Sequence, residues 1–176
     1  MVTAKENLRG IVAMTFDRVI GSNNTLPWRR MPSDMRRFRE RTLGRTMVMG
    51  WSTFSSIIER SGKPLHGREN LVLTHHHAEE VRRTGATPIT SIEDALLVSD
   101  YRRVYVIGGQ QIYETFLPHI SLLEVTLVYA HLGGDRYFPE IKGGQWAITA
   151  QSEPAFHDPR DEYASNFIFY RRIAEA

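Results

Sequence analysis

The sequence predicts an α/β protein in which helices cover a largely parallel sheet. Short runs of β-branched and apolar residues alternate with amphipathic segments, which is the pattern of such a fold. Two runs end in glycine and lead straight into a helical pattern, "TMVMG" into "WSTFSSI" and "VYVIGG" into "QQIYETF". The last two long runs have no helical segment between them, so we expect an antiparallel pair at that edge of the sheet.

The strands are predicted from their β-branched and aromatic content. In chain order they are "GIVAMTF", "TMVMG", "NLVLT", "TPIT", "RVYVIGG", "LEVTLVYA" and "NFIFYRRI". The helices are predicted from apolar residues at helical spacing, over residues 33–43, 52–58, 78–83, 92–98 and 110–117. Pro32 and Ser33 make a good start for the first helix, with Ser33 as its N-cap.

Length and composition indicate one soluble globular domain. The 176 residues suffice for one substantial core, so we expect a single domain over residues 1–176. No apolar run approaches the roughly 18 residues of a membrane helix. The absence of cysteine excludes a disulfide framework and thiolate metal sites. The start, "MVTAKENLRG", lacks the apolar core of a signal peptide, and we expect a cytoplasmic protein that does not bind membranes.

The charge of the chain permits an anionic partner. The formal net charge is +2 and the pI is about 9.0. Only three of the 22 basic residues are lysine (Lys5, Lys63 and Lys142), and the others are arginine. A net charge of +2 is too small to argue for nucleic acid, whereas a polyanionic small molecule fits it equally well. The arginines between Arg29 and Arg45 are better explained as a solvated helix face, because no aromatic residues interleave as a stacking platform.

The two glycine junctions have two readings. They place helix N-termini and bare backbone N–H groups at the carboxyl ends of strands, where phosphate-bearing ligands bind in open sheets. Either junction alone is more simply a tight turn that needs the conformational freedom of glycine. Neither is GxGxxG, but two in one short chain make a dinucleotide site as good an explanation as two turns.

Asp34, in "WRRMPSDMRRF", is the carboxylate that the pattern singles out. Helical spacing puts it on one face with Phe38 and Thr42, with Met35 beside them, while Arg36, Arg37, Arg39 and Glu40 point elsewhere. It is either an acid in a first helical turn, favoured by the helix dipole, or a carboxylate turned inward. An inward carboxylate is costly unless a partner satisfies it, and a ligand with paired N–H donors, such as an aminopyrimidine ring, would bind it bidentately.

The chain resembles the bacterial-type dihydrofolate reductases over nearly its whole length. The resemblance is carried by seven segments in the correct order: "DRVIGSNNTLPW", "PSDMRRFRERT", "VMGWSTFSSI", "PLHGRENLVLT", "VYVIGGQQIYETFLP", "VTLVYAHLGGDRYFP" and "YASNFIFYRR". It implies a central eight-stranded, mostly parallel sheet with an antiparallel C-terminal strand and four flanking helices. It further implies a monomer that binds antifolate inhibitors. The implied activity is hydride transfer from NADPH to pterin C6 of 7,8-dihydrofolate, with protonation at N5, supporting one-carbon and thymidylate metabolism.

The resemblance also implies the substrate site. Asp34 would grip the pterin N3 and 2-amino groups, Trp28 would order a water beside the pterin, and Thr126 would hydrogen-bond the acid. Arg68 would clamp the α-carboxylate of the substrate's glutamyl group, for which bidentate arginine suits better than lysine. "VIGSNNTLPW" resembles the mobile active-site loop, with Leu26 where methionine is often found. Other implied substrate contacts, each explained equally well as core packing, are Ala13, Met35, Phe38, Ile57, Leu65, Ile107 and Tyr113.

For the cofactor, the resemblance implies two phosphate-binding turns and contacts to the nicotinamide. The residues are Ala13, Ile20, Gly50, Trp51, Ser52, Thr53, Thr74, His75, Gly108, Gly109, Gln110, Gln111 and Ile112. Trp51 stands where the family usually has an arginine for the 2′-phosphate. It is either an exposed aromatic that caps a helix or a side chain that stacks on adenine, and we expect His75 to supply the missing cationic contact. Adjacent histidines are poorly spaced for a metal, and we expect none. Two segments are longer than in common members, "WRRMPSD" by one residue and "IERSGKPL" by a few.

Two other functions are compatible with the pattern. One is a riboflavin-pathway reductase of related fold, which also uses NADPH, although the acid on the helix and "PLHGR" argue against it. The other is a non-catalytic folate- or RNA-binding module, which would oxidise no nicotinamide.

Overall fold

An eight-stranded sheet organises the molecule. The computed structural model describes residues 4–152 and 158–173. The strand order of the sheet is β5-β4-β3-β6-β1-β7-β10-β9. Its strands are β1 (Lys5–Thr15), β3 (Thr46–Gly50), β4 (Glu69–Leu73), β5 (Thr87–Ile89), β6 (Val104–Val106), β7 (Ile120–Val128), β9 (Trp146–Gln151) and β10 (Ser165–Arg172). Two short strands, β2 (Val19–Gly21) and β8 (Arg136–Tyr137), pair separately.

Most of the sheet is parallel, which confirms the predicted fold class. All pairs from β5 to β7 are parallel, whereas β10 is antiparallel to β7 and β9 is antiparallel to β10. The predicted antiparallel pairing of the last two long runs is therefore confirmed. Its place at the edge is wrong, because β9 lies outside β10.

Five α-helices occur in the described part of the chain, where the resemblance implied four. They are α1 (Pro32–Thr42), α2 (Trp51–Ser61), α3 (Ala78–Arg83), α4 (Ile92–Tyr101) and α5 (Gln110–Phe116), which a 3₁₀ turn follows at Leu117–His119. Parallel strands need crossover connections, and each of the five parallel connections here contains a helix. None of the described helices has the length and apolarity needed to cross a membrane.

Three strands were not predicted from the sequence. β2 and β8 have only three and two residues, too few for a periodic pattern. β9 is an edge strand, and five of its six side chains are exposed, so it lacks an apolar run. Predicted helix ends also differ, most at α2, which begins at Trp51 and continues to Ser61.

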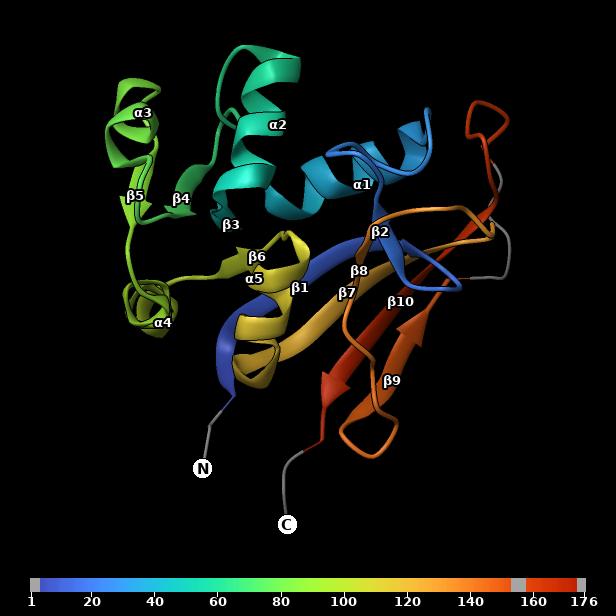
Figure 1. Ribbon diagram of the computed structural model, residues 1–176. Helices are drawn as coiled ribbons and strands as arrows, with labels where there is room; N and C mark the ends of the chain where they lie inside the picture. Colours follow the sequence, from blue (N-terminus) through green and yellow to red (C-terminus); the bar gives the residue numbers. More distant parts are fainter. Residues whose placement is uncertain (1–3, 153–157, 174–176) are drawn as a thin grey trace.

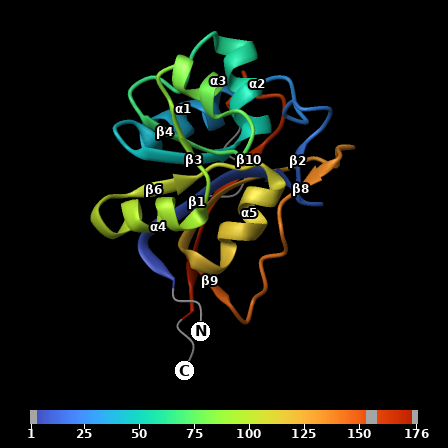
Figure 2. The same cartoon turned by 60° about the vertical axis from the view of Figure 1, so that its left-hand side comes forward.

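The helices form two layers on opposite faces of the sheet. α1, α2 and α3 lie on one face and α4 and α5 on the other (Figures 1 and 2), as right-handed crossovers from this strand order require. Successive strand residues therefore pack into different cores: Met47 and Met49 pack with Phe54 of α2, whereas Val48 packs with Ile112 of α5. In the sheet, β3 and β6 are neighbours, and the connection after β3 leads to one face while the connection after β6 leads to the other. Ligands bind at such switch points in open sheets.

The N-terminus of α1 is held by a distant acid and not by its own sequence. The prediction that Ser33 is the N-cap is wrong: the N-cap is Met31, which has no side-chain capping bond, and Ser33 lies inside the helix. Asp161 caps the helix instead, because its carboxylate accepts hydrogen bonds from the Ser33 backbone N–H at 3.0 Å and from the Ser33 hydroxyl. The cap is 128 residues away in sequence, so no local pattern could indicate it.

We expect Asp161→Ala to lower the free energy of unfolding by about 1–2 kcal/mol, the usual cost of losing a helix cap. Urea denaturation followed by circular dichroism measures this. Asp100→Ala is the matched control, since Asp100 pairs with Lys5 at 2.7 Å on the exposed surface and such pairs contribute at most about 1 kcal/mol. Equal stability losses in the two variants would contradict the capping role.

Candidate active site

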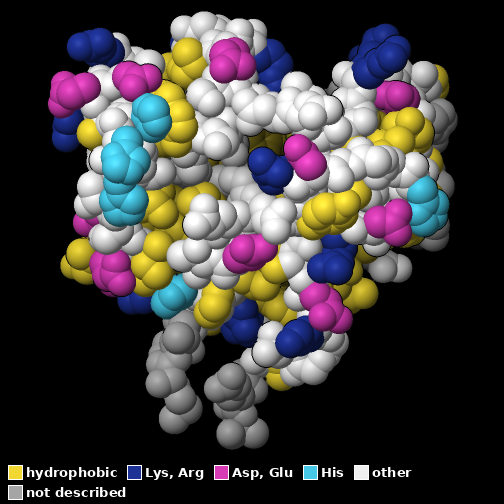
Figure 3. Space-filling view, viewed as in Figure 1, with side chains coloured by type: hydrophobic (Ala, Val, Ile, Leu, Met, Phe, Trp, Pro, Cys, Tyr) yellow, Lys and Arg dark blue, Asp and Glu magenta, His cyan; other side chains and the backbone are white. Residues whose placement is uncertain are grey.

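A large hollow lies at the carboxyl edge of the central strands. It has a volume of about 1140 Å³ and is lined by residues of β1, the segment after β2, α1, α2 and α5. The space-filling view shows this hollow between α2 and α5 (Figure 3). It therefore lies at the switch point of the sheet, and its size suits a ligand of cofactor dimensions together with a smaller molecule.

Asp34 lies in the wall of this cavity, in the first turn of α1. The residue is half-buried, and the Thr126 hydroxyl donates to its Oδ1 at 2.7 Å. No ion pair involves Asp34 within the described ranges, so one hydroxyl is the side-chain partner of this carboxylate. Both expectations for Asp34 hold together, because it is an acid of the first turn and also faces a cavity.

Burial raises the pKa of Asp34 above its ordinary value, because removal from water disfavours the charged carboxylate. The hydrogen bond from Thr126 and the charge of Arg37 lower this pKa in part, while the charge of Asp161 raises it further. On the opposite wall, burial raises the pKa of Tyr113, whose hydroxyl donates to the Ile11 carbonyl at 2.7 Å. The site thus contains an acid, Asp34, whose charged form is destabilised by burial, and a phenol, Tyr113, that stays neutral.

The two glycine junctions lie side by side at the cavity. The Gly50 N–H donates to the Gly108 carbonyl at 2.9 Å, which joins the ends of β3 and β6. A Cβ added at Gly50 would come within 2.9 Å of Ile112 Cγ1, so glycine is needed there for close approach. Gly50 caps α2 without a side-chain hydrogen bond, which leaves first-turn N–H groups free for an anionic ligand.

The segment after β2 forms one side of the cavity mouth. Its tip is a tight turn closed by hydrogen bonds between Ser22 and Thr25, with Asn23 and Asn24 at positive φ. The Ser56 hydroxyl of α2 donates to the Asn24 carbonyl at 3.1 Å, so the turn touches α2 across the opening.

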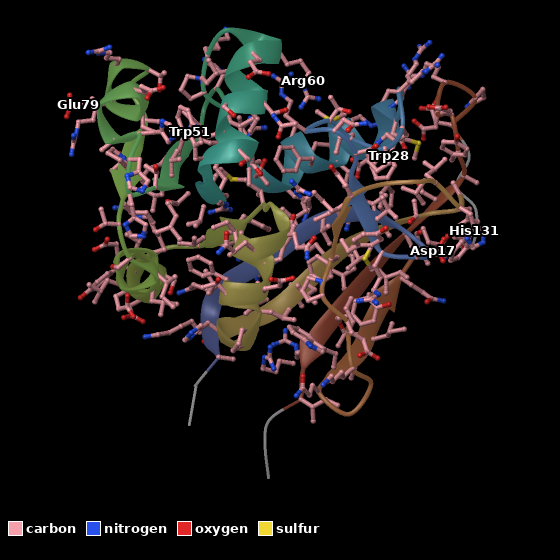
Figure 4. The ribbon with its side chains drawn as sticks, in the orientation of Figure 1. Asp17, Trp28, Trp51, Arg60, Glu79 and His131 are labelled. Atoms are coloured by element: carbon pink, nitrogen blue, oxygen red, sulfur yellow. The ribbon has the colours of Figure 1, made fainter. Side chains whose placement is uncertain are left out.

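Two further contacts hold β2 and the turn before it, at the end of the molecule away from α2. In the turn before β2, the Asp17 carboxylate lies 2.6 Å from Nδ1 of His131. Figure 4 shows these two side chains beside each other. The Asp135 N–H donates to the Gly21 carbonyl at 3.0 Å.

The structure gathers most of the predicted site residues around this cavity. Those that line it are Ala13, Ile20, Asp34, Met35, Phe38, Gly50, Trp51, Ser52, Thr53, Ile57, Leu65, Thr74, His75, Ile107, Gly109, Gln110, Gln111, Ile112 and Tyr113. Four others do not line it: Thr126, Gly108, Trp28 and Arg68. Thr126 contacts Asp34, and Gly108 bonds Gly50. Trp28 is buried against Met31 and Val128.

Arg68 lies just beyond the cavity wall. Its guanidinium sits 5.6 Å from the centre of the Phe38 ring, and Nε donates to the Thr42 hydroxyl at 2.9 Å. It lines a separate hollow of about 270 Å³, to which Arg45, Arg102 and Arg103 also contribute. Burial, with the charge of Arg39, lowers the pKa of Arg68. Glu69 lines the same hollow but pairs with Arg102 at 3.1 Å, and Arg68 has no ion pair among the described residues.

Trp51 stacks on a protein side chain. Its ring lies 4.0 Å from that of His77 at an angle of 6°, so one face of the indole is covered. Figure 4 shows Trp51 between α2 and α3, and histidine side chains gather beside α3 in Figure 3. His77 also contacts Glu80 at 2.8 Å. An adenine can therefore meet only the other face of Trp51, with His75 in the adjoining wall.

Several wall residues were not predicted. Arg60, on α2, and Arg136 bring positive charge to the cavity (Figure 4 for Arg60), and Asp135 brings negative charge. Gln110 reaches across the sheet edge, because its side-chain oxygen accepts from the Tyr137 N–H at 2.8 Å. Exposed arginines are common in this sequence, so no local signal separated Arg60 or Arg136 from the others.

The prediction that the arginines of α1 form mainly its solvent face is wrong for Arg37 and Arg41. The Arg37 side chain is only 12% exposed and lies over the Phe167 ring, 4.1 Å from its centre. Arg41 donates twice to the buried Glu124, at 2.7 and 2.8 Å. Helical spacing alone missed this, because α1 packs on the sheet with the face that carries these arginines.

Comparison with known proteins gives one consistent match. The family described as "Dihydrofolate reductase" matches residues 7–172. The dihydrofolate reductase of Bacillus subtilis (strain 168) is 35% identical over 163 residues, which cover 92% of each chain. That of Haemophilus influenzae is 34% identical and covers 92% of this chain and 96% of its own. The dihydrofolate reductase from Enterococcus faecalis complexed with NADP(H) and RAB-propyl has a TM-score of 0.83 at 30% identity, covering 97% of this chain and 99% of its own.

Replacing the strained acid should stabilise the fold. Because burial raises the pKa of Asp34 in the folded state, its stabilising contribution is full below the unfolded pKa and is lost as pH rises through the folded pKa. We therefore expect Asp34→Asn to raise the free energy of unfolding at neutral pH, with a gain that shrinks toward about pH 4. Urea unfolding at both pH values measures it. A variant less stable than the wild type at neutral pH would show that Asp34 is not strained.

Proposed function

The chain belongs to the dihydrofolate reductase family of oxidoreductases, and we propose that it reduces 7,8-dihydrofolate to 5,6,7,8-tetrahydrofolate with NADPH. The observation that carries the proposal is the Asp34 carboxylate, half-buried in the cavity wall with one hydroxyl as its side-chain partner. Such an acid needs paired N–H donors, and the N3–H and 2-amino groups of a pterin supply them in one plane.

In this proposal Asp34 fixes the pterin and stabilises positive charge on it. The carboxylate lies on α1 and binds the pyrimidine edge of the ring, so it is not the direct proton donor to N5. Water admitted past the segment after β2 brings that proton, while Asp34 favours the protonated ring electrostatically. Thr126 holds the acid in the orientation that the pterin requires. Trp28, behind the wall, would support this region without touching the ring.

The cofactor site fits NADPH, which supplies the hydride when bound. The close approach at Gly50 and the unsatisfied first turn of α2 suit a pyrophosphate, and Ser52 and Thr53 add hydroxyl groups to the same wall. Ala13 and Ile20, at the other side of the cavity, would offer backbone groups to the carboxamide. The exposed face of Trp51 would receive adenine.

Arg68 would bind the α-carboxylate of the substrate's glutamyl group. Its half-buried guanidinium has no acid partner among the described residues, and it lies over Phe38, beyond the end of the cavity that Leu65 lines. The proposal takes residues 1–176 as one domain that acts as a cytoplasmic monomer, is open to antifolate inhibitors and supports one-carbon and thymidylate metabolism.

The direct experiment follows nicotinamide absorbance with and without dihydrofolate. We expect oxidation of NADPH that depends on dihydrofolate, and Asp34→Asn should lose on the order of 10²–10⁴ in rate at neutral pH while still binding NADPH. Asp100→Asn, an exposed acid on α4, is the control and should keep wild-type turnover. Near wild-type turnover in Asp34→Asn would remove this residue from the mechanism.

The wall near Trp51 predicts a pH-dependent choice of cofactor. We expect NADPH to be preferred over NADH, and the preference to grow as pH falls from about 8 to about 5.5, where histidine side chains ordinarily gain a proton. His75→Gln should weaken this dependence. His76→Gln, an exposed neighbour outside the cavity wall, should leave it unchanged. The readout is the ratio of kcat/KM for the two cofactors, and a ratio of one at every pH would refute the prediction.

A further inference from the structure

One face of α1 packs on the sheet through charged residues. Asp34, Arg37 and Arg41 follow one another at helical spacing, and they meet β7 and its neighbour β10. Asp34 contacts Thr126, and Arg41 contacts Glu124, two residues earlier on the same face of β7. The same face of α1 thus carries the Asp34 carboxylate at the cavity and contacts a second carboxylate, that of Glu124, farther along the helix.

Glu124 is the centre of a buried charged cluster. It has no exposed surface, and it accepts hydrogen bonds from Arg41 and, at 2.9 Å, from the Tyr105 hydroxyl. Arg9 approaches it at 3.5 Å. Burial alone would raise the pKa of Glu124, but these hydrogen bonds and the arginine charges outweigh burial and hold the pKa below its ordinary value. Glu124 is therefore an anion in the interior.

Within the described part of the chain, Arg37 makes no hydrogen bond to either carboxylate. Its Nη2 lies 4.0 Å from Glu124 Oε2, and its plane rests over the rings of Phe167 and Phe169, at 4.1 and 5.2 Å. Among the described residues, neither terminal nitrogen of Arg37 has a hydrogen-bond partner, although both are buried. Burial, the first cause, lowers the pKa of Arg37, while the charges of Glu124 and Asp34 raise it.

The position of the Arg37 guanidinium is unfavourable for the stability of the fold. A buried guanidinium without hydrogen bonds loses its hydration and gains only partial compensation from aromatic rings and a distant anion. An apolar side chain would pack on Phe167 and Phe169 without this cost. The position therefore favours a role for the charge itself. Asp34, three residues earlier on α1 and in the cavity wall, is one of the groups whose charge acts on Arg37.

We propose that Arg37 is a positioning residue of the active site: fixed by Glu124 and the rings of β10, it acts on the Asp34 carboxylate through its charge and not through a bond. This inference rests on the proposed function, in which Asp34 must be anionic to grip the pterin. A direct Arg37–Asp34 ion pair would compete with the substrate for the carboxylate, whereas a cation behind it stabilises the anion and leaves both oxygens to Thr126 and the ligand.

Charged and titratable groups face Asp34 from each element packed around it. Arg37 on α1 lowers its pKa, Asp161 before β10 raises it, and burial is the largest influence. Thr126 on β7 donates to it, and Tyr113 on α5 is a neutral phenol near it. Removing the cation should therefore raise the pKa of Asp34, and removing the anion behind the cation should lower it.

The test uses two variants that should shift the pKa of Asp34 in opposite directions. Arg37→Met keeps the stacking volume and removes the charge, and Glu124→Gln keeps the shape of its side chain and removes the opposing charge. Arg36→Met is the control, because it makes the same charge change on an exposed neighbour. The readout is the pH profile of kcat/KM for dihydrofolate at saturating NADPH, together with the pH profile of Kd for a 2,4-diaminopyrimidine.

We expect the apparent pKa of the acid to move up in Arg37→Met and down in Glu124→Gln, each by a several-fold change in proton affinity, with no movement in Arg36→Met. Raised ionic strength should leave the Arg37→Met shift in place, because buried charges are screened little. A purely structural role would reduce thermal stability or kcat without shifts of opposite sign. Profiles that do not move in either variant would overturn the inference.

Two outcomes keep the inference separate from the proposed function. If the wild-type protein shows no dihydrofolate-dependent oxidation of NADPH, the proposed function fails; if it turns over and the profiles stay fixed, only the role of Arg37 fails. Should Arg37→Met not fold, Arg37→Lys takes its place beside Glu124→Gln. It keeps the charge, so we expect a profile close to that of the wild type, and a large upward shift would count against the inference.

Discussion

Partial burial of the Asp34 carboxylate costs free energy. The residues around α1 offset this cost in part and leave the cavity open. Thr126 supplies one hydrogen bond, and the remaining lone pairs face the cavity. A guanidinium paired directly to the acid would stabilise the fold more and would block the ligand. The protein instead leaves a partly satisfied anion, whose full satisfaction must come from a molecule with matched donors.

The position of α1 is set by residues far from it in sequence. Asp161 caps its first turn, and Glu124 anchors its last turn through Arg41. Both anchors are carboxylates on the C-terminal part of the chain, which also supplies Thr126. The acid that faces the cavity is thus oriented by the antiparallel side of the sheet, while the glycine turns on the parallel side form the opposite wall. The cavity lies at the switch point between β3 and β6, where the connections after these two strands lead to opposite faces of the sheet.

The segment after β2, at the cavity mouth, has little regular secondary structure. On one side it follows β2, which pairs with β8 and is preceded by the Asp17–His131 contact. On the other side, the Ser56 hydroxyl donates one hydrogen bond to the Asn24 carbonyl. Residues 23–26 of this segment are exposed. Segments that open over an active site are drawn from such weakly packed parts of a fold.

The sequence alone determined the α/β class, the parallel core, the glycine junctions and the candidate acid, because periodicity, β-branched runs and glycine are local properties of the chain. Only the tertiary structure decided which face of α1 is buried, and so revealed Arg37 inside the molecule, Arg41 paired with the buried Glu124, and Ser33 inside the helix. It also decided the partner of Trp51, which stacks on His77. These features depend on residues that are distant in sequence and come together in the fold. A local sequence pattern does not indicate which distant side chains will be in contact.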